Sequence, residues 1–379
     1  MLRYLTSLLE ARYHPLNTIE LSVPNLIHNY HYLSNLEKDI LVAPVLKSNA
    51  YGHGLIEVAK ILDPFHPPFF CVDSLYEAYA LHKAGIATPI LIMGYVHPDN
   101  LRVKKLPFSF AVYDIGMLEA LKEYQPHAPL HVFVDTGMHR EGVLVSELHN
   151  FLLHAQELSL HIDGLMSHFA MGDNPRNSNT RAQVKEFIKA KEIMREVGIL
   201  PQWIHASASL GFLHSQDYPG VLGNVVRSGI ALYGIDPENK NPVLKPVLEL
   251  TSTLVQIKTI TKGERVGYDF TYTAKENMKI GILPLGYHDG VDRRLSDVGF
   301  VTIDGVLCPI IGKVSMNLTT IDITHLSHSH IGQKVVVYSK DSKDKNSIGI
   351  AAQRISTIPY ELLVHLTPST RRVVISNIV

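Results

Sequence analysis

The chain has 379 residues, of which 46% are hydrophobic and 19% are charged. This length exceeds the size at which one hydrophobic core usually stops growing, so we expect two domains. The 35 basic and 36 acidic residues nearly balance, which gives no support for a nucleic-acid or membrane-surface partner. The two cysteines, Cys71 and Cys308, lie far apart in apolar runs. They favour a reducing cytoplasm over a disulfide framework.

Residues 1–17 form an N-terminal extension that precedes the first regular pattern. Leu2, Leu5, Leu8 and Leu9 share the spacing of an amphipathic helix. No small-residue cleavage site follows, so we do not expect a signal peptide. No apolar run approaches the ~20 residues that a membrane-spanning helix needs.

Residues 18–242 alternate short apolar runs with helical patterns, such as Thr180 to Val197 and the segment in which Ser74 can cap a helix with Glu77. We expect eight strands, at 42–47, 69–72, 90–94, 108–113, 131–135, 164–169, 203–207 and 225–234. Eight buried strands that alternate with helices predict a (β/α)8 barrel of the TIM type. A doubly wound sheet is the alternative, but no G-x-G-x-x-G follows the first strand.

Residues 243–379 have a different pattern. β-Branched runs at 248–260, 300–311 and 334–339 are separated by Gly, Asp and Lys turns, and helical periodicity nearly disappears until Ser347. We therefore expect a mostly β C-terminal domain after the barrel, in an α/β protein overall.

The sharpest local motif is APVLKSNAYGHG at 43–54, in which Lys47 ends an apolar strand. The C-terminal ends of barrel strands carry the reactive groups in such folds, and desolvation there suits a lysine to Schiff-base chemistry. The two glycines that follow would let the backbone approach a ligand closely. From spacing alone, a strand-end lysine that reaches solvent is the simpler interpretation.

The motif resembles the signature of alanine racemases, in which the lysine carries pyridoxal 5′-phosphate (PLP) as an aldimine. Further motifs of that family follow in order between about residues 18 and 325: VDTGMHREGV (134–143), MSHFAMGD (166–173), HASASLG (205–211), NVVRSGIALYGIDP (224–237), GYDFTYTA (267–274), PLGYHDGVDRRL (284–295) and GKVSMN (312–317). A chance series of this kind is very improbable.

The resemblance implies a role for residues in each motif. Lys47 and Tyr268 are the implied catalytic bases, on opposite faces of the substrate. The implied cofactor-binding residues are Lys47, Tyr51, Arg140, His168, Ser209, Arg227, Gly229 and Ile230. The implied substrate-binding residues are Arg140, Tyr287 and Met316. Ser209, Gly229 and Ile230 follow the seventh and eighth strands, where many barrels bind phosphate.

Arg227 would face the ring nitrogen of the cofactor. An arginine does not give up its proton at working pH, so it leaves that nitrogen neutral and limits side reactions. Without the motif, a salt-bridged barrel arginine would be the simpler interpretation. Likewise, without its motif Tyr268 would be an ordinary strand aromatic.

The implied function is the racemisation of L-alanine and D-alanine through a PLP aldimine and two-base proton transfer, which supplies D-alanine for cell-wall peptidoglycan. The implied assembly is a cytoplasmic homodimer in which the barrel of one subunit and the β domain of the other share an active site. The substrate stays open between alanine and another small amino acid such as serine.

Three alternative functions fit the sequence less well. A PLP decarboxylase of the same fold would need a Cys-Asp pair in its β domain, whereas GYDFTYTA follows the racemase pattern. Single-domain barrels that bind PLP for homeostasis lack a β domain. The spacing of His325, His328 and His330 is also typical of metal ligands, but a solvated loop explains it more simply, so we expect no metal site.

The chain departs from the family pattern at several positions. Phe133 stands where many members carry a carbamylated lysine, and a phenyl group cannot supply the carboxylate that orients Arg140. The other departures are Ala208, Asn317 and Pro368. They put substrate preference and turnover in question more than fold or cofactor.

A lack of carbamate at position 133 has a direct consequence. We expect the activity to be the same in buffers stripped of carbon dioxide and in buffers supplied with bicarbonate, because Phe133 has no amine to carbamylate. Initial rates measured in sealed, degassed buffer test this. A clear loss of activity on stripping, reversed by bicarbonate, would contradict it.

Overall fold

The structure is a computed structural model that describes residues 14–215, 223–238 and 241–376. The chain divides into two compact units. The barrel unit is Leu26–Leu244, and the β-rich unit combines Met1–Asn25 with Lys245–Val379. The helix expected from Leu2 to Leu9 lies outside the described residues.

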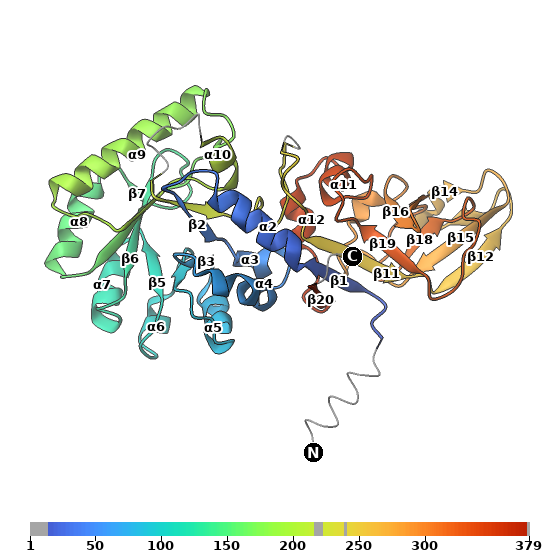
Figure 1. The fold of residues 1–379 in the computed structure, drawn as a ribbon, viewed down its shortest axis with the longest axis horizontal. Coiled ribbons are helices and arrows are strands. Elements are labelled where there is room, and N and C mark those ends of the chain that lie inside the picture. Colours follow the sequence, from blue (N-terminus) through green and yellow to red (C-terminus); the bar gives the residue numbers. More distant parts are fainter. Residues whose placement is uncertain (1–13, 216–222, 239–240, 377–379) are drawn as a thin grey trace, which may run out of the picture. The chain divides into compact units, whose positions relative to one another are not determined.

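The barrel unit is built on parallel strands with helices outside them (Figure 1). The strands are β2 (Leu41–Pro44), β3 (Phe70–Val72), β4 (Ile90–Ile92), β5 (Ser109–Val112), β6 (Leu130–Asp135), β8 (Ile162–Met166), β9 (Trp203–His205) and β10 (Val225–Ser228), with a short β7 (Val143–Leu144) beside β6. β10 pairs with β2, and bridges at Val45–Cys71 and Ala208–Arg227 join the remaining neighbours. The expected (β/α)8 barrel is therefore confirmed.

The helices of the barrel unit are α2 (Val23–Ser34), α4 (Leu55–Leu62), α5 (Leu75–Lys83), α6 (Pro98–Leu101), α7 (Ile115–Tyr124), α8 (Leu148–Glu157), α9 (Ser178–Glu196) and α10 (Ser209–Leu213). The predicted cap of α5 is present, since the Glu77 backbone N–H donates to Ser74 Oγ at 3.2 Å. α2 precedes the first barrel strand, and the Asn29 side chain donates to the Leu232 carbonyl after the last one. The expected strand at 225–234 ends at Ser228, so Gly229 and Ile230 lie in the turn that follows.

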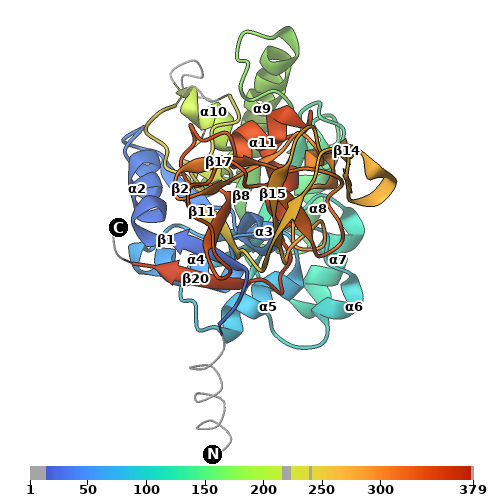
Figure 2. The ribbon, with the colours of Figure 1, turned by 90° about the vertical axis from the view of Figure 1, so that its right-hand side faces the viewer.

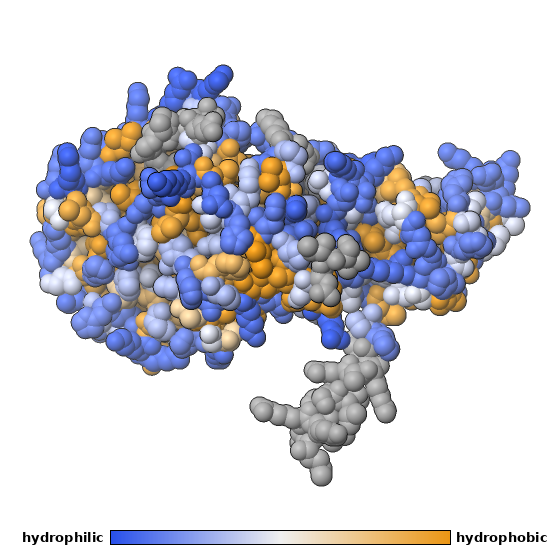
Figure 3. All heavy atoms as spheres, viewed as in Figure 1, coloured by the Kyte–Doolittle hydropathy of each residue, from blue (hydrophilic) through white to orange (hydrophobic). Residues whose placement is uncertain are grey.

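The barrel strands carry apolar side chains on both faces, and β3 and β4 are buried along their whole length. This is typical of parallel strands covered by helices on one side and by the barrel core on the other. The outer surface shown in Figure 3 mixes hydrophilic and hydrophobic side chains. Among the helices that the structure describes, none is long and apolar enough to cross a membrane.

The β-rich unit contains a six-stranded sheet in the order β17-β16-β19-β11-β1-β20. Its strands are β1 (Thr18–Ser22), β11 (Leu248–Thr253), β16 (Phe300–Ile303), β17 (Val306–Pro309), β19 (Lys334–Tyr338) and β20 (Arg371–Ile375). β12 (Gln256–Ile260), β15 (Met278–Leu283) and β18 (Thr319–Asp322) form a second sheet, and β13 (Arg265–Val266) pairs with β14 (Tyr272–Thr273). Figure 2 brings β11, β15 and β17 into view. The helices α11 (Ile348–Arg354) and α12 (Pro359–Val364) complete the unit.

One segment lies in a different unit from the one expected. Residues 18–25 were expected in the barrel, but β1 pairs antiparallel with β11 and parallel with β20. Its backbone hydrogen bonds are thus satisfied between β11 and β20 in the β-rich sheet, and the compact barrel unit begins at Leu26.

Candidate active site

Lys47 follows the first barrel strand by three residues, at the C-terminal end of the barrel. Its Nζ lies 3.2 Å from Oδ1 of Asp73, which directly follows β3. Both side chains are partly exposed, at 37% for Lys47 and 56% for Asp73. The amine is therefore accessible to a small molecule while a carboxylate stands ready to hold its ammonium form.

The four residues after Lys47 form a left-handed turn, with φ between 52° and 55° from Ser48 to Tyr51. Such a conformation costs an L-residue roughly 1–2 kcal/mol, so the surrounding structure must hold it. Glu77 does so by accepting hydrogen bonds from the backbone N–H groups of Asn49 (3.3 Å) and Asp73 (2.9 Å). The turn directs Tyr51 back toward the strand β10, and Gly52 (φ 77°) ends it.

Tyr51, Ser209 and Gly229 come together beyond the ends of β2, β9 and β10. Ser209 Oγ accepts from the backbone N–H of Gly229 at 2.9 Å and from that of Ala231 at 3.3 Å. A Cβ at Gly229 would lie 2.5 Å from the Tyr51 hydroxyl oxygen, so a larger residue there would displace the Tyr51 ring. Two hydroxyls and the backbone N–H groups of the turn after β10 make a small polar cradle that suits a phosphate group.

Arg227 is buried, with 4% of its surface exposed, and its guanidinium is held by neutral acceptors. Nη1 donates to Nδ1 (2.7 Å) and to the carbonyl (2.5 Å) of His205, and Nη2 donates to the Ser167 carbonyl (2.5 Å) and to His168 Nδ1 (3.4 Å). Among the described residues, the Nε–H makes no hydrogen bond. One donor of a fixed cation therefore remains for a ligand.

Burial lowers the pKa of Arg227 to about 10, so it stays charged at neutral pH. Burial, reinforced by the Arg227 charge, lowers the pKa of His131 and of His168 to about 3, and that of His205 well below its usual value. All three imidazoles are thus neutral. Since His205 Nδ1 accepts from Arg227, its Nε2–H donates to His131 Nδ1 at 2.8 Å.

Arg140 lies in the loop between β6 and β7, together with Glu141. Its Nε donates to Glu141 Oε2 at 2.5 Å and its Nη2 donates to Oε1 at 2.7 Å. After burial and Arg227, the charges of Arg140 and Lys47 also lower the pKa of His168. The barrel unit therefore has Lys47, Arg140 and Arg227 within electrostatic reach of His168. Tyr51, Ser209 and Gly229 contact one another, and Ile230 follows Gly229 in the same turn.

Tyr268, Tyr287 and Met316 belong to the β-rich unit and lie on its surface, with 67%, 42% and 56% of their surfaces exposed. The backbone N–H of Tyr287 donates to the Ser315 carbonyl at 3.0 Å. Tyr268 begins the short 3-10 helix Tyr268–Phe270, which is tied to the same region by the Asp269–Lys313 ion pair. The three predicted residues thus share one exposed face, next to the exposed side chains of Phe270 and Leu318.

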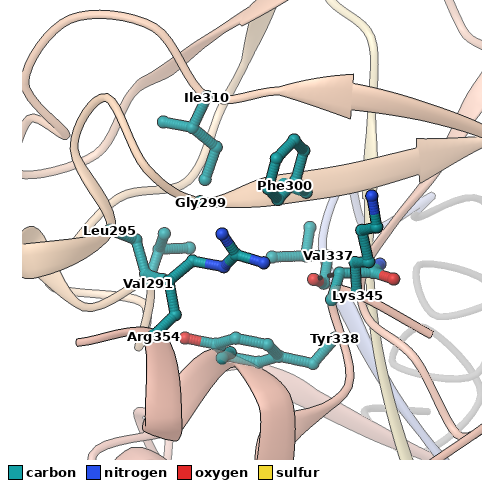
Figure 4. Close-up of a pocket in the computed structure, with 11 residues that line it drawn as sticks. Val291, Leu295, Gly299, Phe300, Ile310, Val337, Tyr338, Lys345 and Arg354 are labelled. Carbon is teal, nitrogen blue, oxygen red and sulfur yellow. Dashed lines mark hydrogen bonds between the residues drawn. The ribbon is translucent and has the colours of Figure 1, made fainter. Parts of the chain in front are cut away.

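The β-rich unit also has a small pocket that none of the predicted site residues lines. In Figure 4, the Arg354 guanidinium points across this pocket, where its central carbon lies 4.7 Å from the centre of the Phe300 ring. This is the geometry of a cation–π contact, and it joins two of the residues that line the pocket. The pocket is therefore part of the packing of the unit.

Asp292, Glu361 and His365 are the group that could hold a metal ion in the described part of the chain. Arg294 already binds both carboxylates, at 2.6 Å and 2.9 Å, which favours a salt-bridge network over a bound cation. The histidines His325, His328 and His330 are exposed in a turn segment. Within the described residues, their ring nitrogens do not gather into such a group.

Five residues around the site were missed by the sequence reasoning: Asp73, Glu77, His131, Glu141 and His205. The two histidines gave a usable signal, because each interrupts an apolar strand run, in HVFVD and WIHAS. A polar side chain that must be buried needs a buried partner. The two histidines are hydrogen-bond partners 74 residues apart, and no sequence pattern indicates that they pair.

Two protein-family models match most of the chain. Residues 21–237 match the family model for the N-terminal domain of alanine racemase, and residues 247–374 match the model for its C-terminal domain. The chain belongs to the alanine racemase family.

Relatives within the alanine racemase family align over most of the chain. The chain is similar to an alanine racemase of Sorangium cellulosum, with 36% identity over 90% of this chain and 95% of that protein. It is 38% identical to one of Streptococcus uberis, over 85% of this chain and 88% of that protein. A structure of the Bacillus anthracis alanine racemase with bound L-Ala-P has 28% identity and a TM-score of 0.87, with 96% of each chain covered.

The departures from the alanine racemase pattern take up different places in the structure. Phe133 is buried, with 4% of its surface exposed. Ala208 precedes α10 at its N-cap position and forms no side-chain cap there. Asn317 and Pro368 are exposed residues of the β-rich unit. Of these positions, Phe133 is the one that lies in a strand leading to the Arg140 loop.

The buried neutral histidines predict a pH dependence of stability. In the unfolded chain His131 takes up a proton near its ordinary pKa of 6.5, whereas in the fold it does so only near 3. Its contribution is therefore complete above pH 6.5 and is lost as the pH falls toward 3, by about 1.4 kcal/mol per pH unit. We expect His131→Gln to have a flatter dependence of unfolding free energy between pH 6.5 and 5 than the wild type.

Urea unfolding at a series of pH values measures this, and the exposed His149 of α8 provides the matched control, His149→Gln. The slopes are compared, because the substitution in the core also lowers stability at every pH. Parallel curves for wild type and His131→Gln would show that His131 is not held neutral by the fold.

Proposed function

We propose that the chain is a PLP-dependent isomerase that interconverts L-alanine and D-alanine by removing and returning the Cα proton. The observation that carries this proposal is the arrangement at the C-terminal end of the barrel. There an accessible lysine, a polar cradle and a buried arginine with one remaining donor lie on or directly after β2, β9 and β10, which are neighbouring strands of the barrel. Membership of the alanine racemase family supports the reaction and the substrate.

The residues fit the cofactor group by group. Lys47 would hold it covalently, and Tyr51, Ser209 and the backbone N–H groups of Gly229 and Ile230 would hold its phosphate. The close approach of the Tyr51 ring to Gly229 supports this assignment, because it brings the hydroxyls of Tyr51 and Ser209 next to the backbone of the same turn. Bound PLP supplies an electron sink that acidifies the Cα–H of an attached amino acid.

Arg227 would present its Nε–H to the ring nitrogen. With a pKa of about 10 it remains a donor at neutral pH and does not transfer its proton. His168, neutral and partly buried next to Arg227, would lie against the ring face. Arg140 would face the phenolic oxygen of the cofactor and the carboxylate of the substrate.

Lys47 Nζ and Tyr268 Oη are the two groups proposed to exchange the Cα proton, one on each face of the substrate. Met316 and Tyr287 would contact the substrate on the Tyr268 side. The exposure of Tyr268, Phe270, Tyr287, Met316 and Leu318 supports a further proposal, since so many large apolar groups on one face indicate that a partner covers them. We propose a homodimer in which this face completes the barrel site of the other subunit.

We also propose that the enzyme acts in the cytoplasm, where D-alanine would be made for peptidoglycan. The barrel and the β-rich unit are proposed to be separate domains, one that carries the cofactor and one that supplies Tyr268. The direct test of the function is an assay of the purified protein with L-alanine, L-serine and other small L-amino acids. The proposal is supported if L-alanine is racemised faster than the other amino acids. A higher rate with another amino acid would show that this amino acid, and not alanine, is the preferred substrate.

The shared site makes a sharp prediction for mixed dimers. Lys47→Ala and Tyr268→Phe homodimers should each lose nearly all activity, because every site lacks one base. Random exchange of subunits makes about half of the dimers mixed, and each mixed dimer has one intact site. We therefore expect co-refolding of the two variants to recover roughly a quarter of the wild-type activity.

Two controls accompany this experiment. Each variant refolded alone must stay at background, and size-exclusion chromatography of differently tagged subunits must show that exchange occurred. Activity that stays at background in demonstrably mixed dimers would place both bases in the same chain, or exclude Tyr268 as a base.

A further inference from the structure

Position 133 provides no carboxylate for Arg140. Phe133 packs in a small apolar cluster with Ala111 and Met166, and Met93 and Tyr113 border it. The rings of Phe133 and Tyr113 meet edge to face, with their centres 6.3 Å apart. Apolar side chains fill the space around position 133, so a residue at another position must orient the Arg140 guanidinium.

In the structure, Glu141 supplies a carboxylate that binds the Arg140 guanidinium. Two nearly parallel hydrogen bonds, Nε to Oε2 (2.5 Å) and Nη2 to Oε1 (2.7 Å), join Arg140 to this carboxylate. A bidentate pair of this kind fixes the plane of the guanidinium as well as its position. It also leaves Nη1 and the second N–H of Nη2 for other acceptors.

The backbone around the pair is held in an unusual conformation. His139 (φ 53°) precedes Arg140 and Gly142 (φ 127°) follows Glu141, so both flanking residues have a positive φ. Asp135 Oδ1 accepts from the N–H groups of Gly137, Met138 and His139, at 2.9 to 3.1 Å. A Cβ at Gly142 would lie 2.5 Å from the Asp135 backbone nitrogen, so the loop packs tightly on the end of β6.

The charge of Glu141 affects the pKa values of two other residues of the barrel unit. Together with burial, which is the larger effect, it raises the pKa of Tyr113. It also opposes the fall in the pKa of the buried Arg227. The carboxylate therefore lies within electrostatic reach of Tyr113 and Arg227, with 29% of its side chain exposed.

We propose that Glu141 is a positioning residue that orients the Arg140 guanidinium toward the cofactor and substrate, in place of a group at position 133. This rests on the proposed function, in which Arg140 contacts both. It explains how the Arg140 guanidinium can keep a fixed orientation although position 133 is phenylalanine.

The test uses Glu141→Gln, which keeps the length of the side chain but removes the charge and replaces one acceptor by an amide donor. We expect the KM for alanine and the Kd for PLP, titrated by absorbance into the cofactor-free protein, each to rise by about fivefold to tenfold. We expect kcat to change less. Glu141→Asp keeps the charge but is one methylene shorter, so its values should lie between those of wild type and Glu141→Gln.

A double-mutant cycle separates positioning from a structural role. In an Arg140→Ala background, Glu141→Gln should change KM and Kd by less than about twofold, because its target is absent. Glu192→Gln, at an exposed position on α9, is the matched control for loss of one acidic charge from the same unit, and should leave all three constants unchanged.

The proposal is overturned if Glu141→Gln keeps wild-type KM and Kd, or if its effect is the same with and without Arg140. In either case the wild-type protein would still racemise alanine and bind PLP, and the proposed function would stand. If the wild-type protein does neither, the proposed function fails and this positioning role fails with it.

Discussion

The buried charge of Arg227 constrains most of the site around it. A guanidinium removed from water is costly unless its donors are satisfied, and the described residues place no carboxylate against it. Two backbone carbonyls and two imidazole nitrogens satisfy it instead. This solution requires both histidines to be neutral. It also fixes the tautomer of His205 and, through it, the hydrogen bond to His131.

The same constraint extends into the barrel wall. His131 can lie beside His205 because β8 has Gly164 opposite, where a Cβ would come within 2.3 Å of the imidazole Nδ1. At the mouth of the barrel, the strained left-handed turn after Lys47 depends on Glu77, whose carboxylate also holds the segment that carries Asp73. The buried guanidinium and the turn that carries Tyr51 are thus held in place partly by His131, His205 and Glu77, to which the proposed function assigns no contact with the cofactor.

The sequence was sufficient for the parts of this arrangement that depend on local patterns. Apolar runs predicted all eight barrel strands, and the Ser74 cap was predicted from its spacing to Glu77. It was not sufficient for β1, because a five-residue strand does not specify whether it pairs with a barrel or with β11 and β20. The left-handed turn and the Arg140–Glu141 pair were also missed, since backbone φ angles and side-chain directions in loops are decided by tertiary contacts.

Lys47, which follows β2, is proposed to hold the cofactor. This proposal is tested most directly by loading the purified protein with PLP, reducing it with borohydride and mapping the labelled peptide. We expect one reduced pyridoxyl group per chain, on Lys47, and none in Lys47→Ala treated in the same way. A label on another lysine, or a protein that takes up no cofactor, would contradict it.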